Sequence, residues 1–257
     1  MDLLPLACFS GAASLGLVAL WPMLKQSPWI EHLLHKQKHK HKQVLPPTKN
    51  SSAETVIEIK GSRGGFLKVL DAEALIKVCN AEALIDNVRR QSRLSVSVFD
   101  RDLLPAIHAY CRFVRLMPAS EAHHHAHPGG LMAHTLEVLN AAMTLRNAYL
   151  LPRGGSAETI DAQRDFWSYA VCLGALFHDV GKPMTDLRID MQVRTSADPV
   201  RWMPIAGSLD ECGAMEYKVD FAPKAERDYG AHRRFPVALM QRLVSSHALS
   251  FIARETS

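Results

Sequence analysis

The sequence predicts a mainly α-helical fold: a helical bundle with a small β excursion, preceded by an N-terminal hydrophobic helix. Apolar side chains recur at helical spacing through most of residues 66–257, whereas residues 187–193 alternate apolar and polar side chains as a strand does. With 47% hydrophobic and 22% charged residues, the composition is globular and excludes extensive disorder. The five cysteines are scattered without CxxC spacing, which disfavours a thiolate zinc site and favours a reducing compartment.

Residues 1–24 are expected to anchor the chain in a membrane. No charged side chain occurs from Leu3 to Leu24, and this stretch is long enough to cross a bilayer as a helix. Asp2, with no basic residue before the apolar stretch, disfavours a secretory signal peptide. The lysines that follow place the body on the cytoplasmic side of that membrane. A buried core helix is the alternative, because the stretch contains prolines and glycines.

Residues 25–65 are expected to form a basic spacer and linker, rich in histidine and lysine. The segment His35–Lys42 suits a solvated spacer attracted to anionic lipid head groups, with loose metal or nucleic-acid binding as the alternative. Residues 66–257, by contrast, contain nearly as many acidic as basic side chains. Charge alone therefore does not indicate that this body binds nucleic acid.

The body divides into helices separated by short irregular segments. Residues 117–130, rich in glycine and proline, are expected to be irregular, and a strand near 187–193 opens an excursion that ends near Phe221. Gly181, with Pro183 beyond it, is expected to end a helix in the left-handed conformation. Helices are expected over residues 71–90, 100–116, 131–150, 163–180 and 236–253.

Histidines gather in two places that could carry chemistry. Five of them fall between His123 and His134, and His134 shares an apolar helix face with Val138. The pair His178-Asp179 ends a helix of almost entirely apolar residues. A buried carboxylate beside a buried imidazole requires a compensating cation or dense hydrogen bonding, and a divalent metal supplies that charge. A satisfied core histidine is the alternative for any one of them, but the clustering favours a metal site of Mn, Fe, Co or Zn.

These strings resemble two related groups of proteins. His134, His178-Asp179 and Gly181-Lys182 resemble the HD phosphohydrolase superfamily, whose helical members hold one or two metal ions. The wider strings LMPAS, HH, GGL, HTLEV and ALFHDVGKP resemble the N-terminal domain of MobH-type conjugative relaxases, the TraI-like proteins of integrative conjugative elements. The resemblance covers about residues 66–257. It implies an HD-type relaxase domain that nicks single-stranded DNA at a transfer origin and works with the conjugation machinery.

The resemblance also implies roles for individual residues. One or two divalent ions would be bound, with Mn favoured over Fe, Co or Zn. The first ligands would be His134, His178 and Asp179, and the next in order of preference are His125, His232 and His124. The nucleophile would be metal-bound hydroxide or a tyrosine, of which Tyr229 is the best placed in sequence, three residues before His232. Lys182 would contact a phosphate. The alternatives are a core aromatic for Tyr229 and a helix C-terminal charge for Lys182.

One element of the superfamily pattern is missing. That pattern closes with an aspartate on a late helix, and residues 236–253 contain none. We therefore expect a C-terminally incomplete domain that binds a second ion weakly. The alternative functions are an HD-type exoribonuclease, a nucleotide phosphohydrolase, or an inactive truncated metal-binding remnant.

Overall fold

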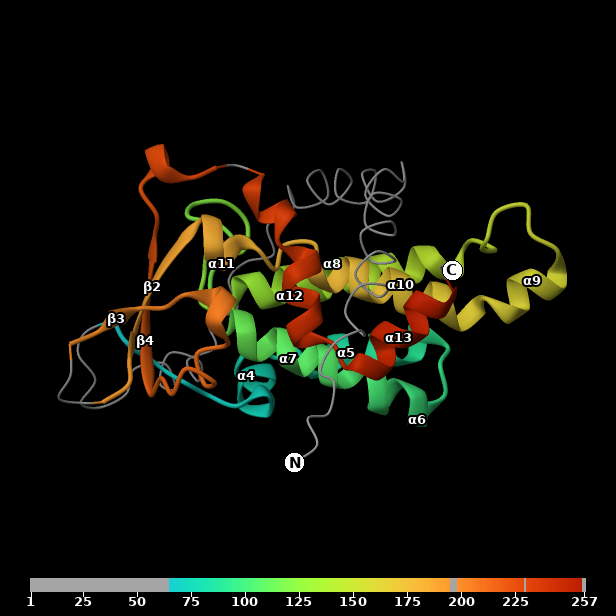
Figure 1. Cartoon of the computed structure of the whole chain (residues 1–257), viewed down its shortest axis with the longest axis horizontal. Helices are drawn as coiled ribbons and strands as arrows, with labels where there is room; N and C mark the ends of the chain where they lie inside the picture. Colours follow the sequence, from blue (N-terminus) through green and yellow to red (C-terminus); the bar gives the residue numbers. More distant parts are fainter. Residues whose placement is uncertain (1–64, 195–197, 229, 256–257) are drawn as a thin grey trace, which may run out of the picture.

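The computed structural model describes residues 65–194, 198–228 and 230–255, and within them it is a helical bundle with a four-stranded sheet at one end (Figure 1). The expected mainly helical fold with a small β excursion is confirmed. The expected anchor of residues 1–24 and most of the spacer of residues 25–65 lie outside the described residues. Across the described part, none of the helices combines the length and apolarity needed to cross a membrane.

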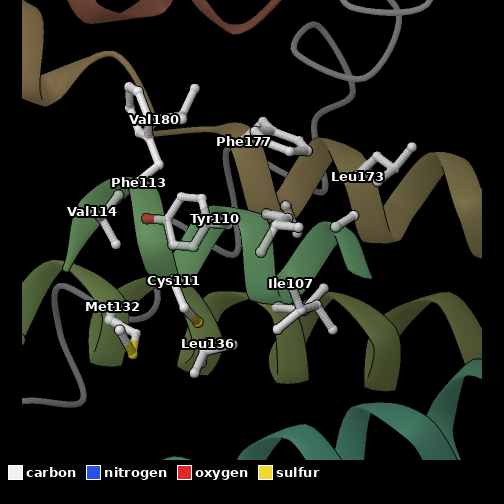
Figure 2. Packing of buried hydrophobic residues seen from close by; sticks show 14 of the residues in the cluster. Ile107, Tyr110, Cys111, Phe113, Val114, Met132, Leu136, Leu173, Phe177 and Val180 are labelled. Carbon is white, nitrogen blue, oxygen red and sulfur yellow. The ribbon is translucent and has the colours of Figure 1, made fainter. Parts of the chain in front are cut away.

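Two long antiparallel helices, α8 (Gly130–Asn147) and α10 (Arg164–Phe177), form the centre of the bundle, and α7 (Leu104–Val114) packs against both. Figure 2 shows their contact, where Tyr110 and Phe177 meet edge to face with ring centroids 6.2 Å apart. These rings and the leucines around them are almost fully buried, so hydrophobic burial fixes the two helices that carry the histidine motifs. The other helices are α4 (Ala72–Val78), α5 (Glu82–Ser92), α6 (Val96–Val98), α9 (Ala157–Ala162), α11 (Lys182–Thr185), α12 (Pro236–Leu243) and α13 (Ser246–Glu255).

Three expected helices are interrupted. The helix expected over 71–90 is two helices, α4 and α5, because Asn80 takes a positive φ of 51° between them. The helix expected over 100–116 begins as a π-helical turn, Phe99–Leu103, that continues into α7. The helix expected over 236–253 is α12 followed by α13, separated at Val244, whose backbone is extended.

The sheet has the order β1-β4-β2-β3, and each neighbouring pair is antiparallel. β2 (Leu187–Gln192) is the strand expected over 187–193, and it pairs along its whole length with β4 (Glu216–Phe221). The short strands β1 (Leu67–Lys68) and β3 (Val200–Arg201) are the two edge strands of the sheet. Tyr217 of β4 is fully buried, and its hydroxyl oxygen accepts a hydrogen bond from the Leu116 amide, which ties the sheet to the end of α7.

Gly181 does not have the expected left-handed conformation. Its φ is −79°, because the chain turns directly into α11 instead of leaving the helix through a left-handed cap. The glycine is required for a different reason. A Cβ at residue 181 would lie 2.2 Å from the backbone oxygen of His232, so only glycine allows these two segments to approach so closely.

Candidate metal centre

His134, His178 and Asp179 lie together where α8 begins and α10 ends, with their ligand atoms all within 4.8 Å of one another. The Nε2 atoms of His134 and His178 are 3.3 Å apart. The Asp179 Oδ2 atom lies 3.5 Å from the first and 3.4 Å from the second. Two ligands each about 2.1 Å from one ion are roughly 3.0–3.4 Å apart at octahedral or tetrahedral angles, so this spacing fits a shared cation.

A backbone carbonyl fixes the orientation of the His178 ring. Its Nδ1 atom lies 2.7 Å from the Ala175 oxygen, and because a carbonyl only accepts, the ring donates from Nδ1–H. The neutral ring then carries its lone pair on Nε2, the atom that faces His134 and Asp179. This is the usual arrangement of a metal-binding histidine, in which an outer acceptor selects the tautomer.

Electrostatics keep Asp179 ionised although it is buried. Burial raises the pKa of this carboxyl group, but His178, His134 and Lys182 together hold the pKa well below its ordinary value. Burial also lowers the pKa of His134, which favours the neutral imidazole. A carboxylate with neutral imidazoles is the protonation state that binds a metal ion.

Lys182, which directly follows Gly181, contacts the Asp179 carboxylate. Its ammonium lies 2.7 Å from Asp179 Oδ2 and donates a hydrogen bond to the Ala119 backbone oxygen at 3.2 Å. A metal ion and Lys182 would therefore share one oxygen of Asp179. The expected contact of Lys182 with a phosphate stays a prediction.

His232 approaches the second oxygen of Asp179. Its Nε2 atom lies 3.4 Å from Oδ1, and its Nδ1 atom is buried with no hydrogen-bond partner. Burial lowers the pKa of His232 and favours the neutral ring. A short 3₁₀ helix, Ala231–Arg234, carries this histidine, and the close contact at Gly181 holds it in place. The two oxygens of Asp179 thus face different imidazoles, which gives room for ligands on both sides of the carboxylate.

His124 and His125 approach the centre from the irregular segment before α8. Their ring centroids lie 6.0 and 5.4 Å from that of His134. His125 has a positive φ of 58°, and a Cβ at Gly130 would lie 2.0 Å from its backbone oxygen. The GGL string therefore allows this histidine loop to close against α8.

Glu137 is a carboxylate that the sequence analysis missed. Glu137 follows His134 by three residues in α8. Its Oε2 atom lies 3.2 Å from Nε2 of His125. A signal was present, because residues three apart share a face of a helix. The centre therefore has a second acidic side chain within contact of one of its expected histidines.

The remaining expected residue, Tyr229, lies outside the described residues. Arg227, a described residue, forms an ion pair with Glu121 of the irregular segment before α8 at 2.9 Å, and its Nε atom donates to the Ala222 oxygen at 2.6 Å. The gathered donors are imidazole nitrogens and carboxylate oxygens. This set suits Mn, Fe, Co or Zn better than a Ca²⁺ ion, which prefers oxygen ligands alone.

In a comparison with known protein families, residues 65–256 match the family model TraI_2, described as "Putative helicase". No curated protein matches the chain. The matched region spans every helix and strand named above, including all the residues of the centre.

Proposed function

The chain belongs to the TraI_2 family, and from this premise we propose that it is a metal-dependent DNA relaxase that nicks one strand at the transfer origin of a conjugative element. Within that family we assign it to the MobH type and its catalytic domain to the HD superfamily. The observation that carries the proposal is the convergence of His134, His178 and Asp179 around one small volume. Side chains that can share one cation would hold the Lewis acid that metal-dependent phosphodiester cleavage uses.

The metal would supply positive charge to the scissile phosphate and activate the attacking group. The residues of the chain provide the rest. The Ala175 carbonyl fixes His178 so that its Nε2 lone pair faces the carboxylate. Lys182 places an ammonium beside Asp179, where it can contact a non-bridging phosphate oxygen. We propose Tyr229 as the attacking nucleophile, on the basis of its position three residues before His232.

We further propose that residues 3–24 tether the protein to the inner membrane, with the catalytic body on the cytoplasmic side. The uncharged segment and the lysines after it support this proposal. Such a tether would keep the relaxase close to the conjugation machinery, which transfers the nicked strand through the membrane.

The test is a nicking assay with the purified chain, Mn²⁺ and a single-stranded oligonucleotide that carries the transfer origin. We expect one cut position with the wild type and none with Asp179→Ala. The variant His108→Gln is the matched control, because His108 lies on α7 outside the centre and should retain both metal and activity. Metal content measured by elemental analysis should fall in Asp179→Ala alone.

Two other outcomes would redirect the assignment. Processive trimming of unrelated RNA from its 3′ end would indicate an exoribonuclease, and hydrolysis of free nucleotides would indicate a nucleotide phosphohydrolase. Equal metal content in the wild type and Asp179→Ala would show that the His178-Asp179 pair does not bind the ion.

A further inference from the structure

A second cluster of charged groups lies at the C-terminal end of α8, opposite the end that carries His134. Residues 134 and 146 of this helix are about 18 Å apart along its axis at ~1.5 Å per residue. Arg146 lies in the last turn of α8, Arg164 begins α10, and Arg93 directly follows α5. Arg93 and Arg164 are both close enough to Arg146 to act on its charge, at a place that the proposed nicking chemistry does not use.

Arg146 is buried without a carboxylate partner. Its side chain belongs to a residue only 8% exposed, and its Nη2 atom donates to the Arg164 backbone oxygen at 2.8 Å. Its Nε atom is buried and has no hydrogen-bond partner. Burial, together with the charges of Arg93 and Arg164, lowers the pKa of Arg146. A buried arginine is normally paired with a carboxylate, so the positive charge of Arg146 remains uncompensated close to these neighbouring arginines.

The neighbouring acids do not neutralise the cluster. Asp161 and Asp165 both contact Arg164, at 3.8 and 3.2 Å. Arg93 is exposed, and within the described part of the chain neither it nor Arg146 has a carboxylate within ion-pair distance. Two positive charges, one of them buried, are therefore left over.

An exposed aromatic side chain adjoins these arginines. Tyr149 follows Arg146 by one turn, is 40% exposed, and its amide donates to the Arg146 oxygen at 3.2 Å. The Arg153 guanidinium lies 5.3 Å from the centre of the Tyr149 ring. Proteins bind single-stranded nucleic acid with exposed aromatic rings and arginines, because the rings stack on bases while the guanidinium groups bind phosphates.

We propose that the exposed Arg93 and Tyr149, with the uncompensated charge of Arg146 adding electrostatic attraction, bind the phosphodiester backbone and a base of single-stranded nucleic acid, at a site separate from the metal centre. The assignment of the transferred DNA strand as the physiological ligand rests on the proposed relaxase function. The binding itself does not, because it needs neither metal nor cleavage.

The test uses a fluorescein-labelled 20-nucleotide oligo(dT) in buffer with EDTA, and fluorescence anisotropy over 50–200 mM salt. Arg93→Asn removes a charge at a backbone position with φ of 56°, which asparagine tolerates. We expect this variant to bind oligo(dT) about tenfold more weakly. The slope of the logarithm of the association constant against the logarithm of the salt concentration should become shallower by about one. Tyr149→Ala should weaken binding about tenfold without changing the slope.

The matched control is Lys77→Gln, which removes one exposed positive charge from α4 and should leave the affinity unchanged. Wild-type affinity in both Arg93→Asn and Tyr149→Ala would overturn the proposal, and so would a loss in Arg93→Asn no larger than that in Lys77→Gln. Competition by polyglutamate as strong as that by unlabelled oligo(dT) would show a site for acidic peptides instead.

Asp179→Ala separates this proposal from the proposed function. We expect it to bind oligo(dT) as the wild type does while it loses nicking. If the wild type does not nick but its binding still depends on Arg93, the relaxase assignment fails and the arginine site stands. If nicking is intact and Arg93→Asn binds normally, the reverse holds.

Discussion

Gly181→Ala should disturb the metal centre through a single backbone contact. An alanine Cβ would lie 2.2 Å from the His232 oxygen, whereas real Cβ atoms stay at least 3.0 Å from such atoms, so one segment must move by at least 0.8 Å. If His232 moves by that amount directly away from Asp179, the 3.4 Å contact between His232 Nε2 and Asp179 Oδ1 lengthens to about 4.2 Å.

Two effects should follow from that shift. Overpacking of this kind costs about 1–3 kcal/mol of unfolding free energy, which for a domain of this size lowers Tm by roughly 2–12 °C. Loss of correct ligand orientation typically lowers metal affinity by about 10–100-fold. Isothermal titration with Mn²⁺ and a thermal melt without metal measure the two quantities separately.

The matched control is Gly154→Ala, in the loop between α8 and α9. Gly154 has a φ of 75° and nothing within 4 Å of its Cβ position, so alanine there costs about 1–2 kcal/mol through backbone strain alone. It should lower Tm in the same range without changing Mn²⁺ affinity. Wild-type Mn²⁺ affinity in Gly181→Ala would refute the argument that the His232 contact supports the ion site.

The remaining predictions concern Glu137, Asp102 and the N-terminal segment. Glu137→Gln should weaken Mn²⁺ binding about tenfold in isothermal titration, while Glu158→Gln on the exposed helix α9 should not. Asp102 is fully buried and contacts Arg101, Tyr169 and His247, so Asp102→Asn should cost about 1–3 kcal/mol in urea unfolding at pH 7. Burial raises the pKa of Asp102, but hydrogen bonds from Arg101 and Tyr169 leave it lowered. Its stabilisation is therefore complete above the unfolded pKa of ~3.9 and is lost as pH falls through the folded pKa, so Asp102→Asn should lose less stability than the wild type below about pH 4. Deletion of residues 1–24 should move the protein from the membrane fraction to the soluble fraction, and a full-length chain that stays soluble without detergent would contradict the tether.

Local patterns predicted much of the fold. The helices that carry His134 and His178 follow from apolar spacing, and the strand at 187–193 follows from alternation. β4 was not predicted, although Tyr217, Val219 and Phe221 alternate with polar residues in the same way. The breaks in other helices depend on single backbone angles, such as the positive φ of Asn80, which periodicity does not reveal.

The candidate site was predictable as a set of residues but not as an arrangement. Histidine clustering and the His178-Asp179 pair indicate metal chemistry because such groups are costly to bury otherwise. The contact between Glu137 and His125 depends on how the preceding loop closes over α8, and the approach of His232 depends on Gly181. Both are long-range contacts that sequence spacing does not encode.

The wide separation in sequence of the side chains around Asp179 has a consequence for folding. His134, Asp179 and His232 come from the start of α8, the end of α10 and a late 3₁₀ helix. An ion bound to all three would act as a reversible cross-link between segments far apart in the chain, in a protein whose described cysteines are all free. Because these ligands come together only in the folded chain, mass action adds ~2.7 kcal/mol of stability when free metal reaches about 100 times its Kd. The availability of metal in the cell would then set the lifetime of the folded protein as well as its activity.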